Sequence, residues 1–243
     1  MADRPILFSA PMIQALLAGR KTQTRRVIAF PGVEKVIDFV RVAVDEIGRP
    51  VYEMKGRDGS HLTRPAGKGL VEYQFWPNFA VGDRLWVREA WSHTGQGVFE
   101  IAQARLVGRG GVIYAADKNP RAPHAQFWPS IHMPREFSRL TLIVTDMRVE
   151  RLQDISWADA LAEGVEMESA DPPFYYVPGI HPHSLTAVGV EELGGRHAER
   201  SFAKLWDLIN AKRGFGWAAN PWVCAVTFTV HRCNIDSMEA AGA

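Results

Sequence analysis

The 243-residue sequence predicts a mixed α+β fold, namely a small closed or nearly closed β-barrel with short helices and two large insertions. Several segments alternate apolar and polar residues with the period of a strand, and the helical patterns between them are short. Two stretches, at about 28–80 and 165–198, interrupt this regular pattern. The length favours one elaborated domain, which we expect to cover residues 1–235 and to end in a disordered tail at 236–243.

The composition indicates a folded chain without a strong bulk charge. Hydrophobic residues make up 47% of the sequence, which is enough apolar side chain for a sizeable core and excludes a disordered polymer. Lys and Arg number 28 against 27 acidic residues, so any contact with nucleic acid must come from a local patch. We expect a monomer, because no heptad pattern or long apolar edge indicates otherwise.

The sequence contains neither a candidate membrane span nor a disulfide framework. No run of about 18 apolar residues occurs, and the charged opening MADRP is followed by only a short apolar run. Cys224 and Cys233 match neither a disulfide scaffold nor a zinc spacing, so we expect two free buried thiols. These features favour a soluble cytoplasmic protein with no membrane contact.

The first element is a predicted short strand at 6–8, followed by a helix. Ser9 can cap this helix, with Pro11 in its first turn, where proline is tolerated. The apolar positions that share one helical face are Met12, Ile13, Leu16 and Leu17. Gly19 follows as a C-terminal cap, so the next residues lie at the exit of the helix.

Strand signals continue after this helix. Segment 28–80 contains short strand-like pieces, VIDFVRVAV and PVYEM, among scattered Gly, Pro and charges, which is typical of a ribbon insertion. Segment 81–91 predicts a turn and then a strand with Leu85 and Val87 on one face.

Two further strands are predicted in the middle of the chain. Segment 110–117 is one of them, and segment 138–152 is the clearest of all, because Leu140, Leu142 and Val144 alternate within a long run. Together these patterns predict an antiparallel sheet.

The last third of the chain predicts two helices, a loop and a strand. Ser156 is the expected N-cap of a short helix that stops at Gly164. Stretch 165–198 is rich in Pro, Gly and His and predicts a functional or capping loop. The next helix ends at Gly214, and segment 220–232 is the closing strand. The apolar face of that helix consists of Phe202, Leu205, Trp206 and Ile209.

The stretch GRKTQTRR, which starts at the helix-ending glycine, concentrates basic and hydroxyl side chains in a nearly neutral chain. A lysine can act as general base for a nearby hydroxyl when its pKa is lowered, so Lys21 could activate Thr24 as a nucleophile. The same cluster, with Arg20, Arg25 and Arg26, could instead bind phosphate. A third interpretation is a basic turn that complements the helix dipole. The residues alone leave all three open.

Other residues could contribute to a site. Glu163 lies at the end of the predicted short helix, where exposed carboxylates are common, so its meaning depends on a partner. His132, in the loop PSIHMPRE, could contact a ligand or stabilise a turn. The aromatic residues that could stack on a flat base are Trp86, Trp91, Tyr175, Tyr176 and Trp217. For Trp206 and Trp222 we expect core packing.

The histidines do not predict a metal centre. The candidates are His124, His132, His181, His183 and His197. Their spacing matches no standard site, and no predicted helix carries a pair at positions i and i+4. The sequence also lacks the glycine motifs that bind phosphate or dinucleotides, and it lacks GxSxG. We therefore expect no metal and no cofactor.

These residues carry a resemblance to a known family. GRKTQTRR resembles the GxKxxTxR signature of the ASCH domain, a relative of the PUA fold, with Gly19, Lys21, Thr24 and Arg26 on the pattern. Later segments of the family resemble VGDRLWVREAW, RVERLQDISWADALAEGV, FAKLWDLIN and NPWVCAVTFTV, so the likeness touches most of the chain outside the two insertions. The resemblance implies a PUA-like barrel in a longer member of the bacterial or prophage type.

The resemblance also implies an activity. Small bacterial ASCH proteins include N4-acetylcytidine amidohydrolases, whose catalytic residues are a lysine, a threonine and a glutamate. Carried over, Lys21 is the base, Thr24 the nucleophile that attacks the acyl carbon, and Glu163 the proton donor to the leaving amine. The implied enzyme is a metal-independent amidohydrolase acting on N4-acylated cytidine or a related modified nucleoside. The expected substrate-binding residues are Arg20, Arg25, Arg26, Trp86, Arg88, Glu89 and His132.

A second function is compatible with the same resemblance. Other ASCH and PUA-like proteins bind RNA, and some have been assigned ribonuclease activity. The alternative is therefore an RNA-binding or RNA-cleaving module that uses its arginines on phosphates. The small amidohydrolases lack the insertions at 28–80 and 165–198, which could narrow, widen or cover the pocket. The charge balance favours a small substrate.

Overall fold

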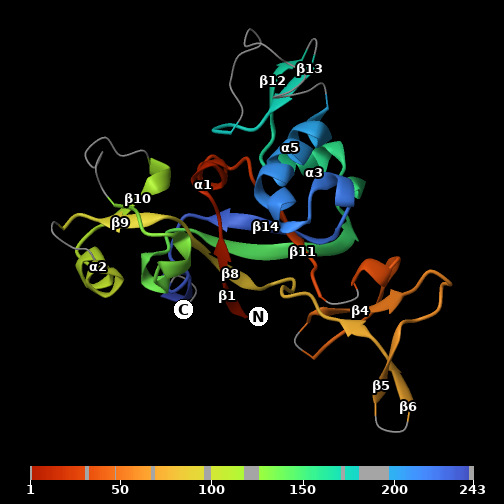
Figure 1. Cartoon of the computed structure of the whole chain (residues 1–243). Coiled ribbons are helices and arrows are strands. Elements are labelled where there is room, and N and C mark those ends of the chain that lie inside the picture. The colour runs from red at the N-terminus through yellow and green to blue at the C-terminus, as the bar shows by residue number, and fades with distance from the viewer. Residues whose placement is uncertain are drawn as a thin grey trace.

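The computed structural model describes residues 2–30, 33–46, 48–66, 69–95, 100–117, 126–170, 173–180 and 197–240. The fold is mixed α+β and is built on a five-stranded sheet with the strand order β1-β8-β11-β14-β2. These strands are β1 (Asp3–Leu7), β8 (Arg84–Arg88), β11 (Thr141–Arg151), β14 (Trp222–His231) and β2 (Gln23–Val27). Figure 1 shows the long strands β11 and β14 side by side at the centre of the molecule.

Pairing in this sheet is antiparallel except between β1 and β8, which run parallel with Ile6 opposite Val87. The antiparallel pairing predicted for segments 81–91 and 138–152 is confirmed by β8 and β11, whereas the parallel pair of β8 with β1 was not predicted. Alternation cannot reveal the difference, because it reports which face of a strand is buried and not the direction of its neighbour. The alternation itself is confirmed, since Leu142 and Val144 of β11 and Leu85 of β8 are buried.

The two edge strands of the sheet approach each other without forming a ladder. Nη2 of Arg26, on β2, donates a 2.9 Å hydrogen bond to the carbonyl oxygen of Leu7, at the end of β1. Within the described residues no backbone pairing joins β1 to β2, so the closed barrel is not found. The sheet curls far enough for one long side chain to span the remaining gap.

The first helix lies where the sequence predicts, although the Ser9 side chain forms no capping hydrogen bond. α1 (Ala10–Leu17) begins after Ser9, and its buried face includes Ile13 and Leu16. Gly19 then takes a φ of +73°, a left-handed conformation that glycine adopts without steric cost. The chain turns there and enters β2.

α3 (Trp157–Ala162) also begins and ends where the sequence predicts. The hydroxyl of Ser156 accepts a 3.1 Å hydrogen bond from the amide of Asp159, which satisfies one of the free N–H groups at the start of the helix. Glu163 follows directly as the C-terminal cap residue.

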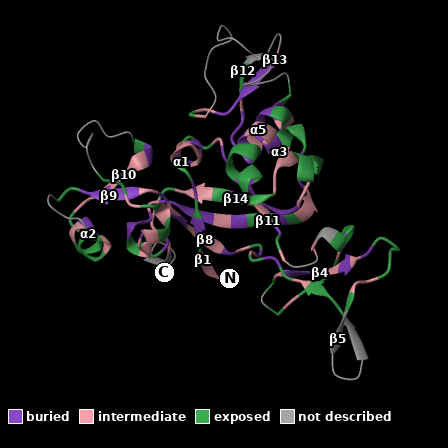
Figure 2. Ribbon diagram, viewed as in Figure 1, coloured by how far each residue is buried: buried purple, intermediate pink, exposed green. Residues whose placement is uncertain are grey.

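α5 (Ala198–Asn210) covers the same face of the sheet as α3 and buries Phe202, Leu205 and Trp206. Ile209 lies on the same helix face, since all four residues line one cavity, but its side chain is 45% exposed. Figure 2 shows the outer surfaces of α3 and α5 exposed above buried positions of the strands.

A ribbon formed by residues 38–75 extends from the five-stranded sheet. Its strands are β3 (Asp38–Val44), β4 (Pro50–Lys55) and β7 (Gln74–Phe75), which form one sheet, and β5 (Thr63–Ala66) and β6 (Gly69–Glu72), which form a hairpin. Figure 1 shows this ribbon on the side of the molecule away from α3 and α5. The strand-like pieces predicted here are confirmed, while the domain boundaries stay a prediction.

Stretch 165–198, expected to be an irregular loop, begins with a hairpin. β12 (Glu166–Ala170) pairs with β13 (Pro173–Tyr176), and Tyr175 packs in the core beneath α5. The prolines around these strands concealed them in the sequence. The rest of the stretch, residues 181–196, lies outside the described residues.

A small lobe lies at the other end of β8. It contains β9 (Trp91–His93), β10 (Val112–Tyr114) and the unpredicted helix α2 (Ile101–Gly108). Trp91 is enclosed at its centre. The strand predicted at 110–117 is thus confirmed over only part of its length.

The segment after β14 packs against the rest of the fold. Ile235 is buried, and Asp236 forms a 2.6 Å ion pair with Arg135 before α6 (Ser237–Ala240). Both cysteines are free thiols, as predicted, although only Cys224 is buried. Among the helices of the described residues, none combines the length and apolar character needed to span a bilayer.

Candidate functional site

The basic stretch leaves α1 and becomes β2, an edge strand that the sequence analysis missed. The residues of β2 are QTRRV, which lack the apolar alternation that predicts a strand. They are nevertheless largely enclosed, because α3, α5 and the end of β1 surround this edge. Polar contacts with residues that are distant in the sequence hold the strand in place.

Lys21 lies fully inside the protein, with 0% of its surface exposed. Its Nζ donates to the carbonyl oxygen of Gln23 at 2.8 Å, to that of Glu163 at 2.9 Å and to Glu163 Oε2 at 2.6 Å. Three acceptors match the three protons of an ammonium group. Burial lowers the pKa of Lys21, and the neighbouring carboxylate of Glu163 opposes that effect.

The interpretation of the stretch as a basic turn at the helix end is therefore wrong. The last turn of α1 carries no basic residue, and the side chains of Lys21 and Arg25 are enclosed. A solvated turn would expose both.

Glu163 is also buried, although its position at a helix end suggested an exposed carboxylate. It is 5% exposed, and its second oxygen, Oε1, lies 3.4 Å from Nη1 of Arg25. One carboxylate therefore lies between two buried cations, Lys21 and Arg25. We call these three residues the Lys21–Glu163 cluster.

Gly164 provides the turn that ends α3 beside the basic stretch. Its φ is +103°, and a methyl group placed on it would lie 3.4 Å from Cβ of Ala15 and 3.7 Å from Cβ of Lys21. Glu163 is thus presented to Lys21 at a point where α1, the following turn and α3 meet.

Arg25 is held by several acidic groups. Nη2 donates to Glu150 Oε1 at 2.6 Å and to Asp159 Oδ2 at 3.2 Å. Burial would raise the pKa of Asp159, but hydrogen bonds from Gln23 and Arg148 and the nearby positive charges lower it to about 2. Because its guanidinium is committed to carboxylates, Arg25 is a poor phosphate ligand. Arg20 is also paired, with Glu166 at 2.6 Å.

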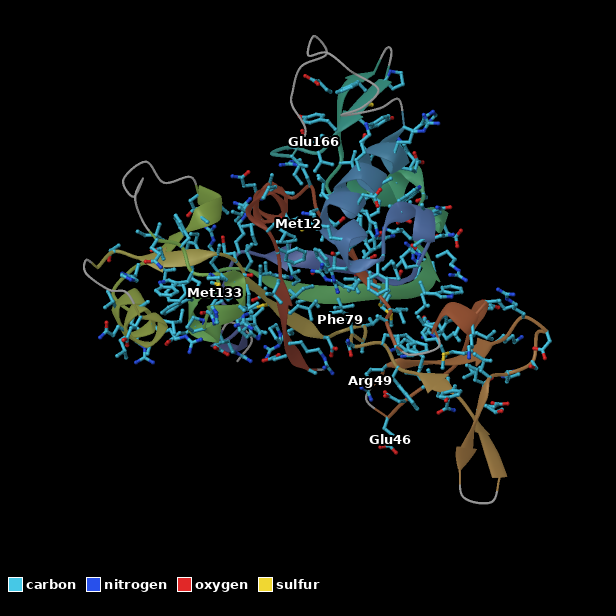
Figure 3. All side chains as sticks on the ribbon, in the orientation of Figure 1. Met12, Glu46, Arg49, Phe79, Met133 and Glu166 are labelled. Carbon is cyan, nitrogen blue, oxygen red and sulfur yellow. The ribbon has the colours of Figure 1, made fainter. Side chains whose placement is uncertain are left out.

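Thr24 faces a cavity of about 200 Å3 beside this cluster. The residue is 2% exposed, and its hydroxyl has no hydrogen-bond partner within the described part of the chain. The cavity is lined by Met12, Thr24, Arg25, Arg26, Val27, Glu163, Phe202, Leu205, Trp206, Ile209, Asn210 and Arg213. Figure 3 labels Met12, which projects from α1 towards α5. A free hydroxyl and a buried carboxylate thus share one cavity.

Arg26 lies at the edge of the same cavity. Its guanidinium donates to the carbonyl of Leu7 and lies 5.2 Å from the centre of the Phe8 ring. Burial lowers the pKa of Arg26, and the negative charge of Glu163 opposes that effect. A cation held in this position can stabilise negative charge that develops in the cavity.

The remaining expected substrate-binding residues lie in a different group. Arg88 stacks on Trp86 with 5.1 Å from Cζ to the ring centre, and Glu89 is buried in a bidentate pair with Arg139. The carbonyl of His132 accepts a 3.1 Å hydrogen bond from Arg105. No hydrogen bond or ion pair between described residues connects this group with the Lys21–Glu163 cluster.

Most aromatic residues expected to stack on a base are unavailable. Trp91, Tyr175 and Tyr176 are buried, so that expectation is wrong for them, and Trp217 packs against the core beneath α5. Trp206 and Trp222 are buried, as predicted.

A second aromatic group, which the sequence analysis missed, lies between the ribbon and β14. It lines a cavity of about 520 Å3, which we call the ribbon cavity. Its lining consists of residues 26–30, Met54, residues 73–79 and Cys224. The run YQFWPNF at 73–79 was the available signal, although it lies in a segment without a regular pattern.

One described group of residues has the geometry to hold a metal ion. Glu53, His61 and Glu72, at the base of the β5–β6 hairpin, offer ligand atoms that all lie within 4.8 Å of one another. Nδ1 of His61 is 3.0 Å from Glu53 Oε2, a distance that an ion pair alone explains. Among the histidines first considered, His124, His181 and His183 lie outside the described residues.

Comparison with known proteins adds no relative to this description. No protein-family model, no curated protein and no solved structure matches the chain. The function must therefore be argued from the geometry of the site and from the resemblance of its motif.

Proposed function

We propose that this chain is an amidohydrolase that removes the acyl group from N4-acylcytidines, using Lys21, Thr24 and Glu163. The observation that carries the proposal is the cavity in which the unpartnered hydroxyl of Thr24 lies beside the buried carboxylate of Glu163, itself paired with Lys21. Amide cleavage needs a nucleophile, a proton acceptor and a proton donor in one place. The proposal includes a PUA-like barrel, supported by the approach of the two edge strands at Arg26 and Leu7.

The first half of the reaction begins with a proton transfer between Lys21 and Glu163. A proton moves from Lys21 Nζ to Glu163 Oε2 over 2.6 Å and leaves a neutral amine and a neutral acid. The amine takes the hydroxyl proton of Thr24 as its oxygen attacks the acyl carbon. The protonated Glu163 then gives its proton to the departing N4 nitrogen, which releases cytidine and leaves an acyl ester on Thr24. Lys21 and Glu163 return to their ionised states.

The second half repeats these transfers with water. Lys21 again passes a proton to Glu163 and accepts one from the attacking water. Glu163 returns its proton to the Thr24 oxygen as the ester breaks, which releases the carboxylic acid. In both halves Arg26 provides positive charge next to the negative oxygen of the tetrahedral intermediate.

The alternative, an RNA-binding or RNA-cleaving module, has weaker support. Two of the three arginines that would bind phosphate are engaged with carboxylates, namely Arg20 with Glu166 and Arg25 with Glu150 and Asp159. Phosphate would have to displace these pairs. The small cavity and the near-zero net charge also favour a small substrate.

The test is a chromatographic assay of cytidine release from N4-acetylcytidine and N4-benzoylcytidine, with and without chelator. We expect release by the wild type in both conditions and a loss of at least about a thousandfold in kcat for Thr24→Val, which removes the nucleophile but keeps its shape. The matched control is Thr145→Val, on the exposed face of β11. Undiminished release by Thr24→Val would contradict the proposal, and so would the absence of release by the wild type.

A further inference from the structure

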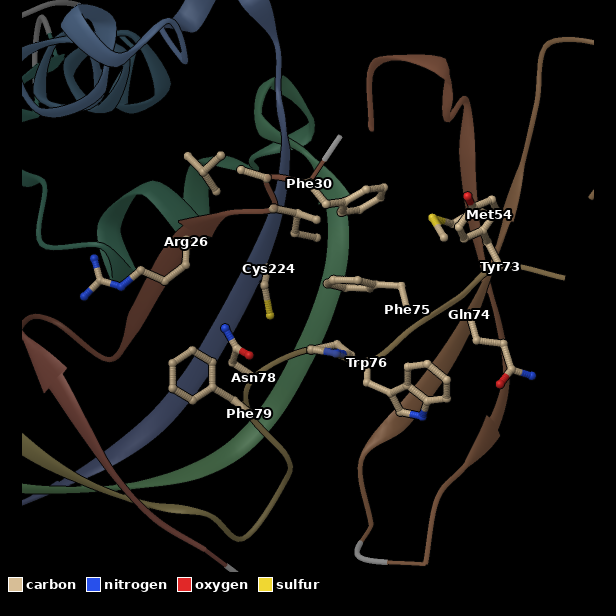
Figure 4. A pocket seen from close by; sticks show the side chains of 14 residues that line it. Arg26, Phe30, Met54, Tyr73, Gln74, Phe75, Trp76, Asn78, Phe79 and Cys224 are labelled. Atoms are coloured by element: carbon tan, nitrogen blue, oxygen red, sulfur yellow. The ribbon is translucent and has the colours of Figure 1, made fainter. Parts of the chain in front are cut away.

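The ribbon cavity differs from a core region in the exposure of its aromatic rings. Tyr73 and Trp76, which line it, are each 42% exposed, although the adjacent Phe75 packs edge-on against Phe39 at 5.3 Å between ring centres. Large apolar side chains that stay partly open around a cavity commonly mark a ligand site. Figure 4 shows the rings of Phe30, Phe75 and Phe79 around the thiol of Cys224.

The polar groups of this cavity indicate which charge and which hydrogen-bonding groups a ligand should carry. Its lining contains one cation, Arg26, and no carboxylate, so it does not favour a positively charged ligand. Gln74 and Asn78 are exposed, and their side-chain amides form no hydrogen bond with described residues; Figure 4 shows Asn78 next to Cys224. An amide offers both a donor and an acceptor, as does the edge of a nucleobase.

Arg26 relates this cavity to the Lys21–Glu163 cluster. It belongs to the lining of both cavities, and in Figure 4 its side chain runs away from the aromatic rings. The positive charge therefore lies at one end of the ribbon cavity, where it suits the phosphate of a nucleotide whose base lies among the rings.

We propose that the ribbon cavity is a separate binding site for a nucleobase, with Trp76 as the stacking surface and Asn78 as the hydrogen-bonding group. The site does not require amide hydrolysis at Thr24. Its volume of about 520 Å3 falls within the usual range for small-molecule sites and exceeds that of the cavity at Thr24.

The test measures binding of cytidine 5′-monophosphate by calorimetry and by quenching of tryptophan fluorescence, with ribose 5-phosphate as the ligand without a base. We expect Trp76→Ala to weaken binding about tenfold and Trp76→Phe to change it less than about threefold, because stacking needs only an aromatic face. Asn78→Ala should weaken binding about fivefold. The matched control is Trp157→Ala, a 49% exposed tryptophan on α3 that should bind like the wild type.

Two results would overturn the inference, namely equal affinity for both phosphates, or unchanged affinity in Trp76→Ala. A cytidine trinucleotide identifies the source of the base, since tighter binding than the mononucleotide indicates RNA and equal binding indicates a free nucleotide. Thr145→Val, on the exposed face of β11, should retain full binding. If the wild type fails to hydrolyse N4-acetylcytidine while Trp76→Ala still loses affinity, the proposed reaction fails and the nucleobase site stands.

Discussion

The Lys21–Glu163 cluster and the ribbon cavity differ in how their polar groups are paired, although Arg26 lines both the ribbon cavity and the cavity beside the cluster. In the cluster, charged groups are buried and engaged with one another, as the three hydrogen bonds of Lys21 show. In the cavity, aromatic rings stay partly exposed and the amide of Asn78 lacks a partner within the described chain. Buried polar groups that satisfy each other fix the position of a side chain, whereas an exposed amide that bonds only to solvent is available to a ligand. We therefore expect substitutions in the cluster to affect stability strongly and substitutions in the cavity to affect mainly binding.

Lys21→Met should have the largest effect. It leaves the carboxylate of Glu163 buried with only the 3.4 Å contact from Arg25, and removal of one partner of a buried ion pair costs about 3–5 kcal/mol. The free energy of unfolding in urea measures this loss. The double variant Lys21→Met/Glu163→Gln should recover part of it, because the uncompensated charge is then gone. A Lys21→Met protein as stable as the wild type would show that the pair is dispensable for folding.

The pH dependence of Asp159 is the next largest effect. Its pKa in the folded protein is about 2, below the ordinary value of 3.8. The folded state therefore gains stability that is complete above the ordinary value and is lost as the pH falls through 4 towards 2, about 2 kcal/mol in all. Asp159→Asn should flatten this part of the unfolding profile. Asp146→Asn, at an exposed site on β11, is the control and should leave the slope as it is.

Ser156→Ala tests the helix that carries Glu163. Loss of the hydroxyl removes the 3.1 Å cap bond to the amide of Asp159 and should lower the free energy of unfolding by about 1 kcal/mol. Ser156→Asp should restore the cap and most of the stability. If Ser156→Ala and Ser156→Asp were equally stable, the hydroxyl would have no capping role.

Trp76→Ala should have the smallest effect on stability. Its side chain is 42% exposed, and exposed substitutions usually change the free energy of unfolding by less than about 0.5 kcal/mol. Thermal and urea unfolding should be close to those of the wild type, even where nucleotide binding is weakened. A loss comparable to that of Lys21→Met would mean that the cavity is part of the structural core.

The elements that could be predicted are those in which local pattern and burial agree. β11 alternates apolar side chains that face one core, and α3 carries its cap and its stop in the sequence itself. β2 could not be found in this way, because Arg25 is buried by acidic residues that come more than a hundred positions later in the chain. Likewise, nothing near Tyr175 in the sequence indicates that α5 will cover it.

The candidate site also contains residues that the sequence predicts and residues that it does not. The motif singled out Lys21 and Thr24, and the resemblance pointed to Glu163, which the fold brings to 2.6 Å from Lys21. Arg88, Glu89 and His132 were expected nearby and lie in another group, at the end of β8 and in the segment before β11. The sequence did not indicate that the aromatic run at 73–79 lines a cavity, because the ribbon brings it against Cys224 only in the folded protein.

Gly164 extends this comparison from charge to shape. Its φ of +103° turns the chain at the end of α3, a conformation that glycine adopts without steric cost. The strength of the Lys21–Glu163 attraction depends on the distance between the charges, and the turn at this glycine helps to set that distance. A side chain at this position would strain the backbone, because residues with a Cβ atom rarely adopt a φ of +103°. An electrostatic property of the site is thus set by a residue that carries neither charge nor polarity in its side chain.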